Sequence, residues 1–313
     1  MIALIIICIV IVIAAPALAL AHKIYRAVFY NTDEMKARPY KIPDGEQYAP
    51  YADHIRDLLS VIEAAPFEPV TIRSVDGLRL YGRYFHIKDG GPLHIQFHGY
   101  HGAAVREFGG CMQCEWELGC NTLLVDQRAH GKSGGNITAF GIRERYDCVS
   151  WAEYAAGRFG PQTPILLSGV SMGATSVLMA SDLQLPASVA GIIADSPYDY
   201  PRDIICEVIR QKKLPVNLVW PLLYWGGRIF ASVDLKSASA LSSVSRTKLP
   251  ILIYHGSGDR LVPCRMSEKI RRANPDCVQL EIFPGAAHGI SYLSDEERYV
   301  KIMRDYIERV TGK

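Results

Sequence analysis

The sequence predicts an α/β fold in which a mostly parallel sheet is flanked by helices. Apolar runs of strand length recur along the chain, and loops rich in small residues follow them; the runs are 93–97, 164–167, 191–194, 250–255 and 278–283. Runs of this kind are typical of parallel strands that are buried on both faces. Runs compatible with helices, over 174–180 and 295–310, alternate with them. This alternation favours a parallel sheet covered by helices.

The chain opens on a long apolar segment. Residues 1–21 contain no charged side chain, and as a helix they would span about 31 Å, close to the roughly 30 Å of a hydrocarbon core. Lys23 and Arg26 follow this segment, so the positive-inside rule predicts a single-pass membrane protein with its larger domain in the cytoplasm. The alternative is a signal peptide that is cleaved after Ala19 or Ala21, followed by secretion. We therefore expect residues 1–30 to form a membrane anchor and its interface.

Residues 31–66 are expected to form a tether and an amphipathic helix. The tether, 31–45, is polar and contains two prolines. Apolar residues then recur at helical spacing from Tyr48 to Ile62, and we expect this stripe to pack on the larger domain rather than on a bilayer. The larger domain spans 67–313 and should begin with a hairpin of two strands, around 70–74 and 78–87.

A Gly-x-Ser-x-Gly motif, Gly169 to Gly173, lies between a predicted strand and a predicted helix. In that context the motif predicts a sharp turn, the nucleophile elbow, which exposes the hydroxyl of Ser171. The backbone N–H of Met172 then lies at a helix N-terminus, where it would stabilise an oxyanion. The alternative is a structural serine at a helix N-cap.

A serine hydroxyl becomes a good nucleophile when a histidine base and an acid that orients it are added. Asp259 follows the strand-like run 250–255, and His288 lies in a loop of small residues after the run 278–283. The order serine, acid, histidine is that of one large class of hydrolytic sites. Asp195, after the run 191–194, is the alternative acid.

The loop His98-Gly-Tyr-His-Gly102 follows the first central strand and should supply a second oxyanion donor, which we assign to the N–H of Tyr100. Asp126 is expected to pair with Arg128 in the turn after the next strand. Other histidines compete with His288 for the role of base, but two of them end strands and should instead hold loop backbones. The competing histidines are His98, His101, His130 and His255, and the first and last of these end strands.

Taken together, these motifs resemble those of the α/β-hydrolase superfamily. The matching segments are 98–102, 126–133, 169–173, 255–259 and 285–288. The chain is most similar to bacterial membrane-anchored serine hydrolases related to the serine aminopeptidase and prolyl-oligopeptidase-like branches, over residues 69–310. The resemblance implies an α/β-hydrolase fold with a mostly parallel sheet of eight strands and a small helical cap. It also implies Ser171 as nucleophile, Asp259 as acid and His288 as base.

An insert at about 198–246 separates two predicted strands and is far longer than a simple crossover requires. Its apolar stretch includes Trp220, Tyr224 and Trp225. As a cap, this stretch would provide an apolar wall over Ser171 for a lipid-like ester. The alternative is ordinary packing of two helices on the sheet.

The sequence therefore predicts a serine hydrolase that acts on carboxylic esters without a cofactor or a metal ion. An aminopeptidase, with Glu207 binding the substrate amine, and a non-catalytic membrane scaffold are the alternatives. The balance of 34 basic against 32 acidic residues argues against a nucleic-acid partner. Gly131-Lys-Ser133 resembles the end of a P-loop, but Asp126 replaces its first glycine. Cys111, Cys114 and Cys120 lack the spacing of a zinc site and are expected to be buried thiols. The sequence predicts no oligomeric state.

Overall fold

The computed structural model describes residues 2–36, 45–102 and 104–312, and for residues 2–13, 104 and 106–111 it describes the backbone alone. Its centre is an eight-stranded sheet with the order β1-β2-β4-β3-β5-β6-β7-β8. Only the pairs β1/β2 and β2/β4 are antiparallel. The predicted eight-stranded, mostly parallel sheet is therefore confirmed. The strands are β1 (Glu68–Arg73), β2 (Arg79–Phe85), β3 (Leu93–Phe97), β4 (Asn121–Asp126), β5 (Ile165–Val170), β6 (Val189–Asp195), β7 (Ile251–Gly256) and β8 (Val278–Phe283).

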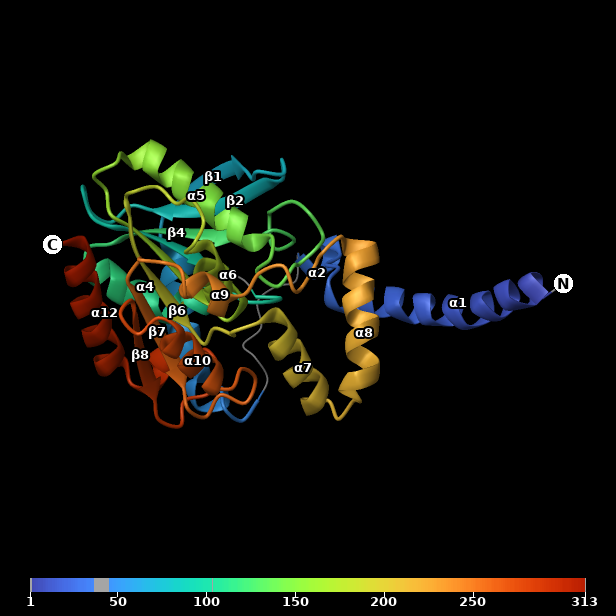
Figure 1. Cartoon of the computed structure of the whole chain (residues 1–313). Helices are drawn as coiled ribbons and strands as arrows, with labels where there is room; N and C mark the ends of the chain where they lie inside the picture. Colours follow the sequence, from blue (N-terminus) through green and yellow to red (C-terminus); the bar gives the residue numbers. More distant parts are fainter. Residues whose placement is uncertain (1, 37–44, 103, 313) are drawn as a thin grey trace.

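Helices connect the strands and cover both faces of the sheet (Figure 1). In chain order they are α1 (Ile2–Val28), α2 (Asp33–Lys36), the 3-10 turn η1 (Ala49–Tyr51), α3 (Ala52–Ala64), α4 (Ala104–Glu117), α5 (Glu144–Phe159), α6 (Met172–Ala180), α7 (Pro201–Gln211), α8 (Val216–Gly226), the π-helical turn η2 (Gly227–Ala231), α9 (Ala240–Val244), α10 (Arg265–Ala273), α11 (Ser291–Ser294) and α12 (Glu296–Thr311). The predicted last helix, 295–310, is confirmed, and the Asp295 side chain caps it by accepting from Arg298 N at 3.1 Å.

Alternate residues of the central strands enter two separate cores. Ile251 and Ile253 of β7 pack in the core that includes residues of α5 and α6, whereas Leu252 and Tyr254 pack in the core that includes residues of α12. Successive side chains of a strand point to opposite faces of the sheet. Burial on both faces explains why these strands are apolar throughout rather than alternating.

The predicted amphipathic helix corresponds to α3 and packs on the body of the protein. Leu58, Leu59 and Ile62 are buried, and Ile62 lies in a small core with Phe85 of β2 and Leu124 of β4. The stripe that repeats at helical spacing is therefore the face of α3 that contacts the domain, as predicted.

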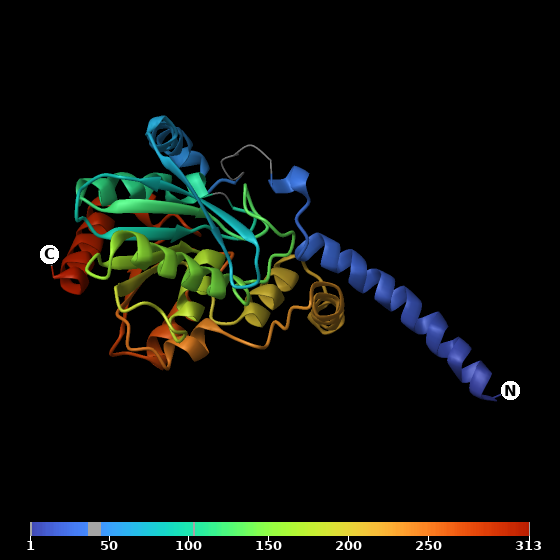
Figure 2. The same ribbon diagram turned by 90° about the horizontal axis from the view of Figure 1, so that it is seen from above.

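Helix α1 leaves the body of the protein, and only its C-terminal end packs against it, beside α8 (Figures 1 and 2). Ala21, Tyr25 and the following Phe29 are buried. A Cβ on Gly226 of α8 would lie 2.7 Å from Ala21 O, so the absence of a side chain there allows the two helices to approach closely. This contact joins the N-terminal helix to the insert between β6 and β7.

The predicted membrane anchor over residues 1–21 falls largely outside the described side chains. Within the part of the chain that is described, no helix combines the length and the apolar character that crossing a membrane requires. The expectation of an N-terminal transmembrane helix, and with it of a single-pass topology, is therefore not supported. Among the described side chains of α1, Ala21 and Tyr25 are buried against the protein, and the others are exposed or half-buried.

Candidate active site

Ser171 lies at a strained turn between β5 and α6. Its φ of 54° falls in the left-handed region, which residues other than glycine adopt rarely. A Cβ on Gly173 would overlap the carbonyl of Phe97 at the end of β3, so only glycine allows α6 to begin this close to the sheet. The Ser171 N–H donates to Asp195 O at 2.8 Å, which ties the turn to the end of β6. The predicted strand–elbow–helix geometry is thus present, with Ser171 only partly buried.

Other residues with strained backbone conformations lie near Ser171, at the edge of the sheet formed by the carboxyl ends of the strands. Among the described residues other than glycine, seven have positive φ, and five of these lie in loops that follow the carboxyl ends of β3, β4, β5 and β6. Strained conformations persist where the surrounding structure enforces them, and they cluster at functional sites. The five residues are His101, Ala129, Phe140, Ser171 and Ser196.

The imidazole of His288 is held by the carboxylate of Asp259. His288 Nδ1 lies 2.7 Å from Asp259 Oδ2, and Asp259 Oδ1 accepts from the backbone N–H groups of Leu261 at 2.9 Å and Val262 at 2.8 Å. Because Nδ1 faces the carboxylate, a proton exchanged with Ser171 would pass through Nε2. The loops after β7 and β8, which were predicted to carry the acid and the base, are therefore in contact.

The His288 loop lies against the elbow. A Cβ on Gly289 would lie 3.5 Å from Val170 Cγ1, the side chain immediately before Ser171. Gly289 N also lies 3.4 Å from Ser196 Oγ at the end of β6. The base loop and the serine turn therefore share one edge of the sheet.

The charge of Asp259 is favoured by its surroundings. Burial alone would raise the pKa of this carboxyl, but hydrogen bonds from His255 and His288 outweigh burial and hold the pKa well below its ordinary value. His255 Nε2 lies 3.3 Å from Asp259 Oδ2, and its Nδ1 lies 2.6 Å from Ser267 Oγ. His255 therefore holds the acid loop, as predicted for a histidine that ends a strand.

The alternative acid, Asp195, is engaged elsewhere. It is buried, and its Oδ1 accepts from Ser196 Oγ at 2.8 Å and Ser291 Oγ at 3.3 Å. Burial raises the pKa of Asp195 despite these bonds. Its described hydrogen bonds are with hydroxyls, whereas Asp259 contacts the ring of His288.

The loop after β3 carries the predicted second oxyanion donor. Within the described part of the chain, no hydrogen bond uses the N–H of Tyr100 or of Met172, so both groups remain able to donate to a substrate oxygen. The Tyr100 ring stacks on Phe140 with ring centres 5.2 Å apart. His98, at the start of the loop, accepts from Gln127 N at 3.0 Å and so holds the neighbouring loop, as predicted.

The expected pair of Asp126 and Arg128 is wrong. Arg128 binds Asp147 of α5 with Nε at 2.6 Å and Asp76 of the β1–β2 turn with Nη1 at 2.9 Å. Asp126 Oδ2 instead accepts from the N–H of Lys132 at 2.9 Å. The long side chain of Arg128 therefore reaches two distant carboxylates instead of a near neighbour.

The predicted wall residues of the insert lie on α8. The rings of Trp220 and Tyr224 stack with centres 5.7 Å apart, and Tyr224 also contacts Trp225 edge-on. Trp225 is 56% exposed, whereas the Tyr224 hydroxyl lies 3.3 Å from Asp234 Oδ1. Trp220 and Tyr224 also pack against the main core, and Arg202 and Lys236 lie over their rings; no described contact joins the three wall residues to Ser171.

Cys114 and Cys120 are buried free thiols, as predicted, and burial raises the pKa of Cys114. The Cys111 side chain lies outside the described residues. The described side chains contain no cluster of three or more histidine, cysteine, aspartate or glutamate residues that could hold a metal ion.

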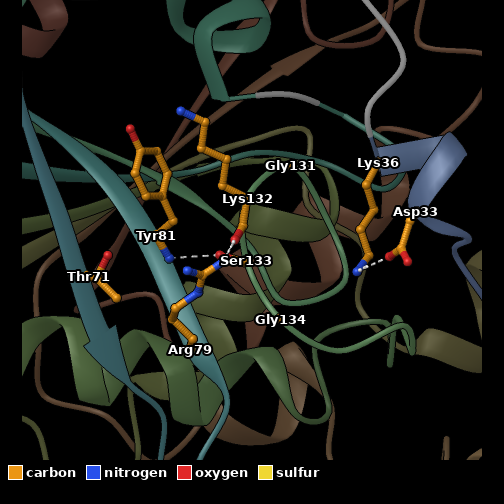
Figure 3. A pocket seen from close by; sticks show the side chains of 9 residues that line it. All are labelled: Asp33, Lys36, Thr71, Arg79, Tyr81, Gly131, Lys132, Ser133 and Gly134. Carbon is orange, nitrogen blue, oxygen red and sulfur yellow. Dashed lines mark hydrogen bonds and ion pairs between the residues drawn. The ribbon is translucent and has the colours of Figure 1, made fainter.

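A polar cavity of about 490 Å³ lies beside the loop that follows β4 (Figure 3). Lys36, Arg79 and Lys132 bring positive charge to it, and Lys36 pairs with Asp33 at 3.2 Å. None of the candidate catalytic residues lines this cavity.

Two long-range contacts of the candidate loops are not marked by any sequence motif. The Tyr48 hydroxyl donates to His288 O at 2.9 Å, and the Tyr100 hydroxyl donates to Val28 O at 2.9 Å. The partners are 240 and 72 residues apart in the chain. No local pattern marks such pairs, because each hydroxyl bonds a backbone carbonyl, which any residue type can supply.

No family model matches this chain. Among curated proteins, the uncharacterized protein YqkD of Bacillus subtilis is 24% identical over 195 residues, which cover 62% of this chain and 64% of that protein. The chain thus spans less than two thirds of that relative's length. The uncharacterized protein Rv2307c of Mycobacterium tuberculosis is 24% identical over 84% of each chain. The human protein ABHD12B is 24% identical over 71% of this chain and 62% of its own.

Solved structures show the same fold. The Pyrococcus furiosus esterase Pf2001 has a TM-score of 0.64 and 22% identity, covering 88% of this chain and 98% of its own. The α/β hydrolase GrgF of Penicillium sp. sh18 has a TM-score of 0.60 and 19% identity, over 79% of this chain and 100% of its own. Est1E of Butyrivibrio proteoclasticus, solved with ferulic acid bound, has a TM-score of 0.58 and 22% identity, over 78% and 100%. The chain therefore has the α/β-hydrolase fold.

Proposed function

We propose that this protein is a serine hydrolase that cleaves carboxylic esters through an acyl-enzyme intermediate. The observation that carries the proposal is the 2.7 Å contact between His288 and the buried Asp259, in a loop that lies against the elbow of Ser171. The similarity of the fold to that of several esterases supports the same assignment.

In this proposal the Ser171 hydroxyl attacks the ester carbonyl while its proton passes to Nε2 of His288. The oxyanion that forms accepts hydrogen bonds from the N–H groups of Met172 and Tyr100. His288 then returns the proton to the leaving alcohol, and it activates the water that releases the acid.

Asp259 contributes by orienting the ring of His288 and by stabilising the imidazolium that forms in each step. Its lowered pKa supports this role, because the carboxylate keeps its charge at neutral pH. No step in this mechanism requires a metal ion or an organic cofactor.

We further propose that residues 67–313 form the catalytic unit and that the insert at 198–246 acts as its cap. Trp220, Tyr224 and Trp225 would then provide an apolar wall for the acyl or alkyl part of a lipid-like ester. Support for this comes from the continuous row of aromatic rings on α8 and from the high exposure of Trp225.

Labelling with a fluorophosphonate probe tests the proposal. The wild-type protein should react, whereas Ser171→Ala should not, because the probe bonds only to an activated serine hydroxyl. Absence of labelling in a folded wild-type protein would overturn the proposal and favour the non-catalytic scaffold.

A peptidase reading has less support. Glu207, the candidate for binding a substrate amine, already pairs with Arg210 at 3.1 Å and Arg265 at 2.9 Å. Its charge is therefore balanced within the protein. A panel that contains p-nitrophenyl esters and aminoacyl p-nitroanilides separates the two functions, and we expect turnover of the esters.

A further inference from the structure

The chain before β1 lies alongside the loop that follows β4. Asn31 N donates to Asn136 O at 2.8 Å, and Thr138 N donates to Phe29 O at 2.8 Å. Tyr30 forms a β-bridge with Ile137 between these two bonds. Residues 29–31 are thus fixed to the body of the protein by backbone hydrogen bonds, directly after the end of α1.

The end of α1 also contacts the candidate oxyanion loop. The carbonyl of Val28, the last residue of α1, accepts from the Tyr100 hydroxyl at 2.9 Å. The last four carbonyls of a helix have no partner within it, so this bond satisfies a group that would otherwise lack one. Phe29 is fully buried and meets Phe140 edge-on with ring centres 5.6 Å apart, and Phe140 in turn stacks on Tyr100.

A second contact with the same loop passes through His130. The buried His130 accepts from the N–H of His101 at 3.2 Å with Nε2, while its Nδ1 lies 2.9 Å from Arg128 O. A carbonyl at Nδ1 requires the proton on that nitrogen, which leaves Nε2 as the acceptor. Asn31 Nδ2 lies 3.4 Å from this Nε2 and donates to Ala129 O at 2.9 Å.

The opposite side of the candidate site is contacted from residues shortly before α3. The Tyr48 hydroxyl donates to the backbone carbonyl of His288 at 2.9 Å. Tyr48 packs with Tyr292 on the core that includes α12. Tyr48 directly precedes η1 and α3, and α3 is docked on the body of the protein through its buried apolar face.

We propose that the segment before β1 positions both halves of the active site. Tyr48 holds the loop of the base, and residues 28–31 hold the oxyanion loop through Tyr100 and His130. This inference rests on the proposed function, because that function assigns the two loops to catalysis. The named side chains are positioning residues, since they contact catalytic loops and not the reacting atoms.

Substitutions of tyrosine by phenylalanine remove only a hydroxyl and so test each contact separately. Tyr48→Phe and Tyr100→Phe should each lower kcat for a p-nitrophenyl ester by about tenfold with little change in KM, because displaced catalytic groups weaken the transition state more than substrate binding. The double variant should lose about a hundredfold, because the two contacts serve separate loops. The rate of fluorophosphonate labelling should fall in parallel.

Tyr306→Phe is the matched control. The Tyr306 hydroxyl lies 2.7 Å from Pro250 O and 3.0 Å from Ile192 O of β6, and its single hydrogen is shared between these carbonyls. Pro250 directly precedes β7, at the edge of the sheet opposite the candidate site. Tyr306→Phe removes a buried tyrosine hydroxyl that also bonds backbone carbonyls. Its Tm should therefore fall at least as much as that of the other variants, whereas its kcat should be retained. Retention of kcat in Tyr48→Phe and Tyr100→Phe, or an equal loss in Tyr306→Phe, would overturn the inference.

Replacement of His130 tests the hydrogen bond that its imidazole accepts from the oxyanion loop. His130→Leu should lower kcat by about ten- to a hundredfold, because the N–H of His101 loses its acceptor. His130→Gln retains an acceptor oxygen and should restore most of that loss; equal activity of the two variants would contradict a positioning role. If the wild-type protein itself fails to react with the probe, the proposed function fails instead, and the two failures are thereby distinguished.

Discussion

The loops at the carboxyl edge of the sheet and the contact between α1 and α8 are held together by different forces. At the sheet edge, groups with fixed directions meet: Asp259 accepts two backbone amides and the ring of His288. Between α1 and α8 the contact is close and apolar, with Gly226 against the backbone of Ala21. Directional bonds require particular residue types at particular places, whereas apolar packing tolerates many. The first region is therefore visible as sequence motifs and the second is not.

The largest expected effect is at Ser171. Ser171→Ala should lower kcat for ester hydrolysis by about a millionfold, the scale on which loss of a nucleophile removes the chemical step. Ser245→Ala, at an exposed serine of the insert, is the control and should keep full activity. Measured turnover in Ser171→Ala above that level would show that the elbow is not the centre of the chemistry.

A smaller effect separates the two acids that share the sheet edge. Asp259→Asn should lower kcat by about ten-thousandfold, because the ring of His288 then loses the carboxylate that sets its orientation. Asp195→Asn should cost far less, since that carboxyl bonds Ser196 and Ser291 instead. Steady-state kinetics of the two variants test this assignment. A larger loss of kcat in Asp195→Asn than in Asp259→Asn would show that Asp195 is the acid.

The apolar region should respond in stability rather than in chemistry. Gly226→Ala should lower the free energy of unfolding by about 1–3 kcal/mol, because the new Cβ would lie 2.7 Å from Ala21 O. Gly157→Ala, at a glycine of α5 with open space around it, should instead stabilise the protein by about 0.5–1 kcal/mol. Urea unfolding measures both, and stabilisation by both substitutions would show that α1 does not pack on α8 in solution.

The smallest expected effect is at Asp76, whose pKa is lowered to about 2 by the hydrogen bond from Arg128. A lowered carboxyl pKa stabilises the folded state above the pKa of the unfolded chain, about 3.9, and this contribution is lost as pH falls towards 2. Asp76→Asn should cost about 1 kcal/mol at pH 7, since the side chain is nearly half exposed and solvent weakens the pair.

The pH dependence gives the check on this last prediction. Urea unfolding between pH 7 and pH 3 should show a smaller loss of stability in Asp76→Asn than in the wild type, because the variant has one acid-sensitive group fewer. Identical slopes would mean that Arg128 does not hold Asp76 in solution.

Within the catalytic fold, the sequence-based expectations differ from the structure in the partners of side chains. Arg128 was expected to bind its neighbour Asp126, but it binds Asp76 and Asp147, which the sheet and α5 bring beside it. Tyr48 belongs to the predicted apolar stripe, yet its hydroxyl reaches the carbonyl of His288. A residue's identity indicates what it can bind, but the partner depends on which loops lie side by side.

The sequence by itself determined the mostly parallel sheet covered by helices, the turn at Ser171 and the placement of Asp259 and His288 after successive strands. These are local properties, because apolar runs specify buried strands and small residues allow tight turns. Only the tertiary structure decided that Asp259 rather than Asp195 contacts the ring of His288, and that residues before β1 contact two loops of the candidate site. The physical reason is that strand order sets which loops are neighbours, and that order results from packing of the whole chain.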